Sequence, residues 1–329
     1  MSTTSACPAC SAPAGPPFVR LGALPVHGRA TFATCDEARA VPVGDLELTL
    51  CEACGVVFNA TFDPALLLPG PPEPGPARPG SRRTARSWHS AGWPGTGCVG
   101  RRSSRSAGIS VLSCCGRRGE RHRGRAGGVR ARQHPARDAA VVTRGPSAQV
   151  VEGMRAAGTS VLLTEVPDVG RVLAEGAFWD LRYEHRCAFT AETLTAFLGR
   201  LGLGVTSART VHGGRTVVAE ASLDAAPAGG VPAADLAGLR GLCEDFGYQA
   251  ARRIAHWAGW LDEQAAAGTS VAVWGPAAVA FLAVLDGHDT PVAAAVDPHP
   301  ARQGRHLGGS GLPVVAPADL KAARPARCC

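Results

Sequence analysis

The chain has 329 residues, which is enough for two or three domains. Hydrophobic residues make up 45% of it and support a globular core, and no apolar run reaches the roughly 18 residues that a membrane-spanning helix needs. We therefore expect a soluble protein. Because no export signal is recognisable, we expect a cytoplasmic protein whose cysteines are reduced.

The formal net charge of +7 is unevenly distributed along the chain. Residues 71–146 hold 16 Arg, no Lys and three acidic residues, which is a local balance of +13, so the remainder carries −6. The sequence therefore indicates a mildly acidic, enzyme-like protein that is interrupted by one basic block.

Two Cys-x-x-Cys pairs mark the N-terminal segment, residues 1–65. Cys7 and Cys10 form the first pair, and Cys51 and Cys54 form the second. Four thiolates complete a closed tetrahedral shell, and Zn²⁺ is its usual occupant. Such a shell leaves no position open for water, so we predict a structural zinc in a zinc-binding module. A disulfide pair and a redox Cys-x-x-Cys are the alternatives.

Residues 66–147 show no sustained helical or strand period and are rich in Arg, Gly and Pro. Such a composition does not bury enough apolar surface to fold. Three interpretations stay open: a segment read in a shifted frame, a disordered basic linker, or an arginine-rich arm that grips nucleic acid. The only aromatic residues of the block, Trp88 and Trp93, lie outside its densest arginines, which disfavours binding of single strands.

Regular periods return in residues 148–225. The patterns predict a helix, a buried strand, a second helix with Thr190 as N-cap, and two strands joined by a turn at Gly213 and Gly214; the ranges are 149–157, 160–165, 190–201, 205–206 and 216–220. This succession is typical of the closing half of a methyltransferase-type α/β sheet. It also fits many other α/β proteins.

Residues 226–329 begin with a long predicted helix, about 233–264, whose apolar residues keep helical spacing. A strand at 270–275, a helix at 277–285 and a strand at 291–297 then predict a small Rossmann-like unit. Gly275 would face a phosphate and Asp297 a ribose hydroxyl. The turn lacks the remaining glycines of the dinucleotide fingerprint.

A phenol, a carboxylate and an imidazole follow the predicted strand at 160–165. They belong to Tyr183, Glu184 and His185, and ligands bind beyond the carboxyl ends of strands in open α/β sheets. His is the natural base near neutral pH, and a Tyr hydroxyl can donate to an oxyanion. The alternative is a loop histidine that packs against Trp179.

Taken together, these motifs resemble the zinc-containing C-methyltransferases, the S-adenosylmethionine (SAM)-dependent family that includes NDP-ketodeoxysugar C-methyltransferases. The resemblance is carried by residues 24–27, 36–38, 44–46, 51–59, 62–63, 165–168, 179–180, 183–185, 213–214, 273–275, 296–298, 303–304 and 309–314. It implies an α/β fold with a zinc-binding module, a class I methyltransferase sheet and a second Rossmann-like domain. It also implies a nucleotide-sugar-like substrate, for which Trp179, Gly275 and Asp297 are candidate contacts.

The resemblance implies carbon methylation beside a ketone. His185 would remove the α-proton, Glu184 would orient or share it, and Tyr183 would steady the enolate before it attacks the sulfonium methyl. The glycine-rich cofactor loop of the family has no counterpart in the arginine block, so the methyltransferase sheet is incomplete and we predict weak or absent SAM binding. The rival predictions are a zinc-ribbon protein that binds nucleic acid through residues 71–146, and a non-catalytic remnant.

Overall fold

The computed structural model describes residues 6–68, 147–156, 158–275, 278–285 and 290–322. Its strands are β1 (Val19–Pro25), β2 (Thr31–Phe32), β3 (Val43–Leu50), β4 (Val57–Asn59), β5 (Val161–Pro167), β6 (Cys187–Ala188), β7 (Gly204–Val211), β8 (Thr216–Ser222), β9 (Val271–Trp274), β10 (Val292–Val296), β11 (His306–Leu307) and β12 (Val314–Val315). Its helices are α1 (Cys35–Arg39), α3 (Ser147–Ala156), α4 (Val169–Glu175), α5 (Ala191–Arg200), α6 (Ala233–Ala266) and α7 (Ala278–Val284), with short 3₁₀ turns at Pro64–Leu67, Phe178–Asp180 and Pro317–Ala322. The fold is mixed α/β with several sheets.

The N-terminal segment forms an antiparallel sheet in the order β1-β3-β4-β6. Strands β1 and β3 pair from Val19–Leu48 to Pro25–Val43, and their inward side chains are apolar. The last strand, β6, comes from a distant part of the chain and pairs with β4 at Phe58–Cys187. This pairing fixes the predicted catalytic loop, which precedes β6, against the N-terminal segment.

The second sheet has the order β5-β8-β7, with β8 antiparallel to both neighbours. Strands β5 and β7 therefore run parallel, and α5 lies in the connection between them. The predicted strands, the Thr190 cap and the glycine turn are confirmed: Thr190 and Thr193 form a capping box, and Gly213 and Gly214 have positive φ. Strand β7 is longer than predicted, because ladder pairing with β8 extends it through exposed polar residues that carry no apolar signal.

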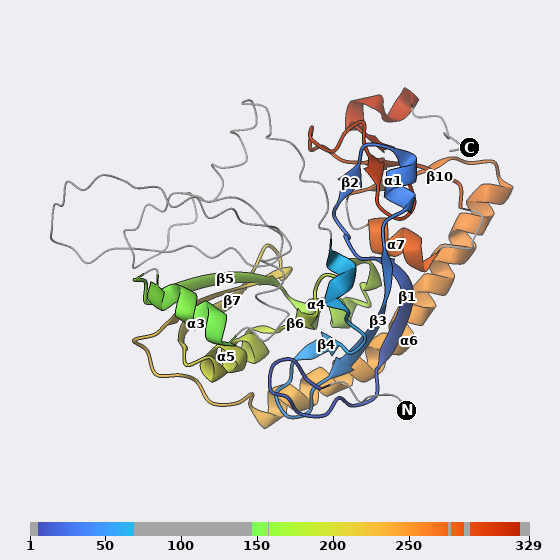
Figure 1. Cartoon of the computed structure of the whole chain (residues 1–329). Helices are drawn as coiled ribbons and strands as arrows, with labels where there is room; N and C mark the ends of the chain where they lie inside the picture. Colours follow the sequence, from blue (N-terminus) through green and yellow to red (C-terminus); the bar gives the residue numbers. More distant parts are fainter. Residues whose placement is uncertain (1–5, 69–146, 157, 276–277, 286–289, 323–329) are drawn as a thin grey trace, which may run out of the picture.

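Helix α6 connects the N-terminal sheet with the C-terminal part of the chain (Figure 1). Its buried residues Leu239, Cys243 and Phe246 pack in one core with β1, β3 and α4, and Leu261 packs farther along in the core of the C-terminal sheet. The predicted helix is thus confirmed as a packed element. The C-terminal half of the helix packs against the C-terminal sheet.

The C-terminal sheet has the order β12-β10-β9, and all its pairings are parallel. Strand β9, helix α7 and strand β10 form the predicted β-α-β succession, with β10 entirely buried. Gly275 follows β9 and Asp297 follows β10, so both predicted contact residues lie at the same edge of this sheet.

Two short strands join the N-terminal and C-terminal parts of the chain. Strand β11 pairs with β2, and the Arg305 guanidinium donates to the carbonyl oxygen of Thr31 at 2.7 Å. The Gly309 N–H donates to the Ala38 carbonyl oxygen at 2.8 Å, and a Cβ at this glycine would lie 2.5 Å from Pro25 Cγ. Figure 1 shows the result: β2 and α1 lie beside the C-terminal sheet.

Among the described helices, none combines the length and the apolar character that crossing a bilayer requires. Residues 69–146, which make up nearly all of the predicted 66–147 block, lie outside the described ranges. The interpretations of that block as frame-shifted, disordered or nucleic-acid-binding therefore stay predictions.

Candidate functional site

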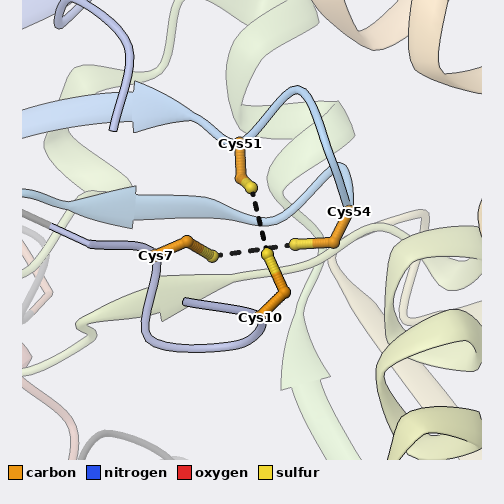
Figure 2. A group of neighbouring side chains, drawn as sticks. All are labelled: Cys7, Cys10, Cys51 and Cys54. Carbon is orange, nitrogen blue, oxygen red and sulfur yellow. Dashed lines mark hydrogen bonds between the residues drawn. The ribbon is translucent and has the colours of Figure 1, made fainter. Parts of the chain in front are cut away.

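The four predicted metal ligands lie together (Figure 2). The sulfur atoms of Cys7 and Cys54 are 3.7 Å apart, those of Cys10 and Cys51 are 3.5 Å apart, and all four lie within 4.8 Å of one another. A tetrahedral zinc with Zn–S bonds of about 2.3 Å would separate its sulfurs by roughly 3.8 Å. The donor set and its spacing fit a closed, structural metal site, whereas disulfide bonds would need sulfurs about 2 Å apart.

The backbone turns at both Cys-x-x-Cys pairs direct the four sulfur atoms toward one another. The second pair sits in a tight turn in which the N–H of Gly55 donates to the Cys51 carbonyl oxygen at 2.7 Å. Gly55 has φ +71°, which favours glycine, and a Cβ there would lie 2.9 Å from Thr193. In the first pair the N–H of Ala9 points at the Cys7 sulfur, 3.4 Å away.

Two of the four thiols, those of Cys51 and Cys54, resist ionisation without a cation. Hydrogen bonding from Cys54 lowers the pKa of Cys7 to about 5, whereas burial raises the pKa of Cys51 to about 11. The pKa of Cys54 is raised, first by its hydrogen bond to Cys7 and then by burial. A divalent cation would favour four thiolates and release the protons that the isolated cluster keeps.

Tyr183 is a core residue of the predicted catalytic loop. It is 1% exposed, its ring stacks on Phe62 with centroids 5.4 Å apart, and its hydroxyl accepts a 2.8 Å hydrogen bond from the N–H of Asp63. The same hydroxyl lies 3.3 Å from the Asp63 carbonyl oxygen, to which it can donate. Both of these bonds go to backbone atoms and anchor the ring, and the contact of Tyr183 with an enolate stays a prediction.

Glu184 faces the loop between β1 and β2. Its Oε2 accepts a hydrogen bond from the N–H of Gly28 at 3.0 Å, and a Cβ at Gly28 would lie 3.3 Å from the same oxygen. The carboxylate is thereby held next to His185 in the chain. Within the described residues its second oxygen makes no hydrogen bond and is able to orient a ring or share a proton.

His185 is partly buried, and its Nε2 atom is buried without a hydrogen-bond partner among the described residues. Burial lowers the pKa of the imidazole to about 4, and the charges of Arg182 and Arg29 lower it further, whereas Glu184 opposes the shift. The ring is therefore neutral at pH 7, which is the protonation state of a general base. Trp179, the packing partner of the alternative prediction, instead makes ring contacts with Phe178 and Arg253.

The low pKa of His185 makes stability depend on pH. The unfolded imidazole binds a proton near pH 6.5 and the folded one only near pH 4, so unfolding takes up a proton between these values and stability falls as the pH drops through that window. We expect His185→Gln to remove about 2–3 kcal/mol of this acid sensitivity. Thermal melts from pH 7 to pH 4 measure it, with exposed His256→Gln as the control. Parallel curves for wild type and His185→Gln would contradict it.

The carboxylates beyond β5 have structural partners. Asp168 caps α4 by accepting from the N–H of Gly170 at 2.9 Å, and burial raises its pKa. Arg171 in the same helix forms ion pairs with Glu175 and with Asp180 of the Trp179-Asp180 motif. These contacts fix the start of the predicted catalytic loop.

The three predicted substrate contacts lie in two neighbouring hollows. Trp179 lines the first, and Gly275 and Asp297 line the second; both are shallow and open to solvent. Asp297 is 6% exposed, and its oxygens already accept from the N–H of His299 at 2.8 Å and from Arg302 at 2.7 Å. Residues 28 and 29, one in each hollow, were missed by the sequence analysis, because a short loop without a motif gives no signal.

A comparison with protein families bears on the second of these hollows. Residues 237–329 match the C-methyltransferase C-terminal domain. This C-methyltransferase C-terminal domain contains most of α6, the parallel sheet, and Gly275, Asp297 and Arg302. The match supports a methyltransferase and covers less than a third of the chain. No curated protein matches the sequence.

Proposed function

We propose that this protein is, by descent, a SAM-dependent C-methyltransferase that acts at the carbon beside a ketone. The observation that carries the proposal is the match of residues 237–329 to a C-methyltransferase C-terminal domain. The substrate class that we propose is a nucleotide-activated deoxysugar or a similar small carbon acid. The Cys7, Cys10, Cys51 and Cys54 cluster would hold a structural Zn²⁺ and take no part in the chemistry.

SAM would supply the methyl group, but the described residues do not offer a fitting cradle for it. In the described part of the second sheet, β5 is followed by Asp168 as a helix cap and not by a glycine-rich loop. We therefore keep the prediction of weak or absent SAM binding. Isothermal titration with SAM tests it, and a micromolar dissociation constant would contradict it.

The proton-transfer step depends on the loop that Tyr183 anchors. The neutral imidazole of His185, with its proton on Nδ1, would take the α-proton on Nε2, and the electron pair of the broken C–H bond would pass into the enolate. Glu184, held by the Gly28 N–H, would favour the imidazolium that forms. Because Nε2 is buried, the loop would open to let the α-carbon of the substrate reach this nitrogen.

This step is testable without SAM. In D₂O, the full chain should catalyse exchange of the α-hydrogen of a nucleotide-activated 4-keto-6-deoxyhexose, followed by mass spectrometry. We expect His185→Gln to slow the exchange about 10²–10⁴-fold, the usual worth of general-base catalysis, and His256→Gln to leave it unchanged. Equal exchange rates for wild type and His185→Gln would refute the assignment of the base.

The alternative function, nucleic-acid binding by residues 71–146, depends on residues outside the described ranges. No contact of the described residues favours it. A salt-dependent gel shift with the full chain would support it.

A further inference from the structure

The loop between β1 and β2 separates the two hollows at the junction of the N-terminal segment and the C-terminal unit. Gly28 lines the first hollow together with Arg182, and Arg29 lines the second together with Asp297 and Arg302. Arg182 and Arg302, from two distant segments, therefore flank the short loop that carries Arg29. The pairing of β2 with β11, directly after this loop, holds the segments together.

The charges at this junction do not cancel. Arg302 forms an ion pair with Asp297, N to O 2.7 Å, and Glu184 accepts from the Gly28 N–H. Within the described residues, Arg29 and Arg182 form no hydrogen bond or ion pair with a carboxylate. His185 adds no charge, because its ring is neutral at pH 7. Three arginines thus meet two carboxylates.

The surroundings of Arg29 disfavour its positive charge. Burial among its neighbours lowers its pKa to about 10, and the positive charges of Arg182 and Arg302 lower it further, while Glu184 and Asp297 oppose them only in part. An arginine that is crowded by two others and lacks a carboxylate partner is stabilised by an incoming anion. Arg29 is nevertheless an exposed residue that its neighbours cover only in part, so a ligand can reach it.

We propose that Arg29, Arg182 and Arg302 form a binding site for a phosphate or diphosphate group carried by the methyl acceptor. The planar guanidinium fork matches phosphate oxygens in bidentate pairs, and such charge-assisted bonds are the strong ones. The hollow beside Arg29 is shallow and open to solvent, so a phosphate group would lie over it rather than enter a cavity. As a role for the acceptor this site rests on the proposed function, but its anion binding is measurable alone.

The probe is inorganic pyrophosphate, titrated calorimetrically into the zinc-loaded full chain at low salt, with inorganic phosphate as a second arm. Wild type should bind pyrophosphate, and Arg29→Gln should weaken binding about 10-fold or more, as expected for the loss of a charge-assisted pair. Arg29→Lys, which keeps the charge without the fork, should fall between them. Arg20→Gln is the matched control, since Arg20 is an exposed arginine of β1 paired with Glu47.

Equal pyrophosphate affinity in wild type and Arg29→Gln would overturn the proposal, and so would the absence of binding to wild type. Circular dichroism and zinc content are measured for each variant, so that a folding defect is not counted as lost binding. Loss of α-proton exchange with retained, Arg29-dependent pyrophosphate binding would refute the proposed function and leave the anion site standing. Retained α-proton exchange with no pyrophosphate binding would refute the anion site and leave the proposed function standing.

Discussion

Removal of the metal from the Cys7, Cys10, Cys51 and Cys54 cluster is expected to unfold the N-terminal sheet. Structural zinc contributes an apparent 10–16 kcal/mol in small zinc domains, and here three of the four ligands are buried within a shared core. That core also contains Leu203 and Val217 of the second sheet, so the damage should spread beyond the N-terminal segment. We expect Cys51→Ser or a strong chelator to lower the melting temperature by more than about 10 °C.

Metal analysis and thermal melts test this expectation. Wild type should hold one zinc per chain, and Cys51→Ser should lose it. Cys243→Ala, a buried cysteine of α6 outside the cluster, should keep the metal and lose only the modest stability of a small core truncation. A chelated, metal-free chain with an unchanged melting curve would rule out a structural metal.

The second large effect is expected where Gly44 meets Tyr183. A Cβ at Gly44 would lie 2.6 Å from Tyr183 Cζ and closer still to Cε2, which a packed ring cannot accommodate. We expect Gly44→Ala to cost about 3 kcal/mol or more and Tyr183→Ala about 3–5 kcal/mol. Tyr183→Phe should cost about 1–2 kcal/mol, since it leaves the N–H of Asp63 without its partner.

A double-mutant cycle separates this contact from general damage. In a Tyr183→Ala background the clash is gone, so adding Gly44→Ala should cost much less than it does in wild type. Gly241→Ala on α6, where no atom lies within 4 Å of the new Cβ, should stabilise the chain slightly. Denaturant unfolding gives each free energy. Additive costs would show that the ring and the glycine do not contact each other.

Local signals in the sequence were sufficient for much of the second half of the chain. Thr190, Gly202 and the Gly213-Gly214 turn mark element ends by caps and positive φ, and these depend only on near neighbours. Helix α4 also has such signals, an Asp168 cap and a left-handed Gly176, and they could have predicted it. The four cysteines lie together as expected, because two residues between paired cysteines allow a tight turn that points both sulfurs to the same side.

The candidate site was less predictable, because its contacts join residues far apart in the sequence. Tyr183 looked like a catalytic phenol in the YEH motif, yet its hydroxyl bonds to Asp63, 120 residues away. The bond of Gly28 to Glu184 spans 156 residues and no motif marks it. The residue types suggested proton transfer as the chemistry. Which of these side chains are free to contact a substrate depends on tertiary packing, which the sequence pattern does not show.

The pairing of β2 with β11 and the bond from Arg305 to Thr31 link positions 274 residues apart. A growing polypeptide leaves the ribosome at about 5–20 residues per second, so β2 is synthesised many seconds before β11, the strand with which it pairs. During that delay the loop that carries Arg29 has nothing to close against. The proposed anion site would thus assemble late in biosynthesis, and loss of the last quarter of the chain would abolish it even with every earlier residue intact.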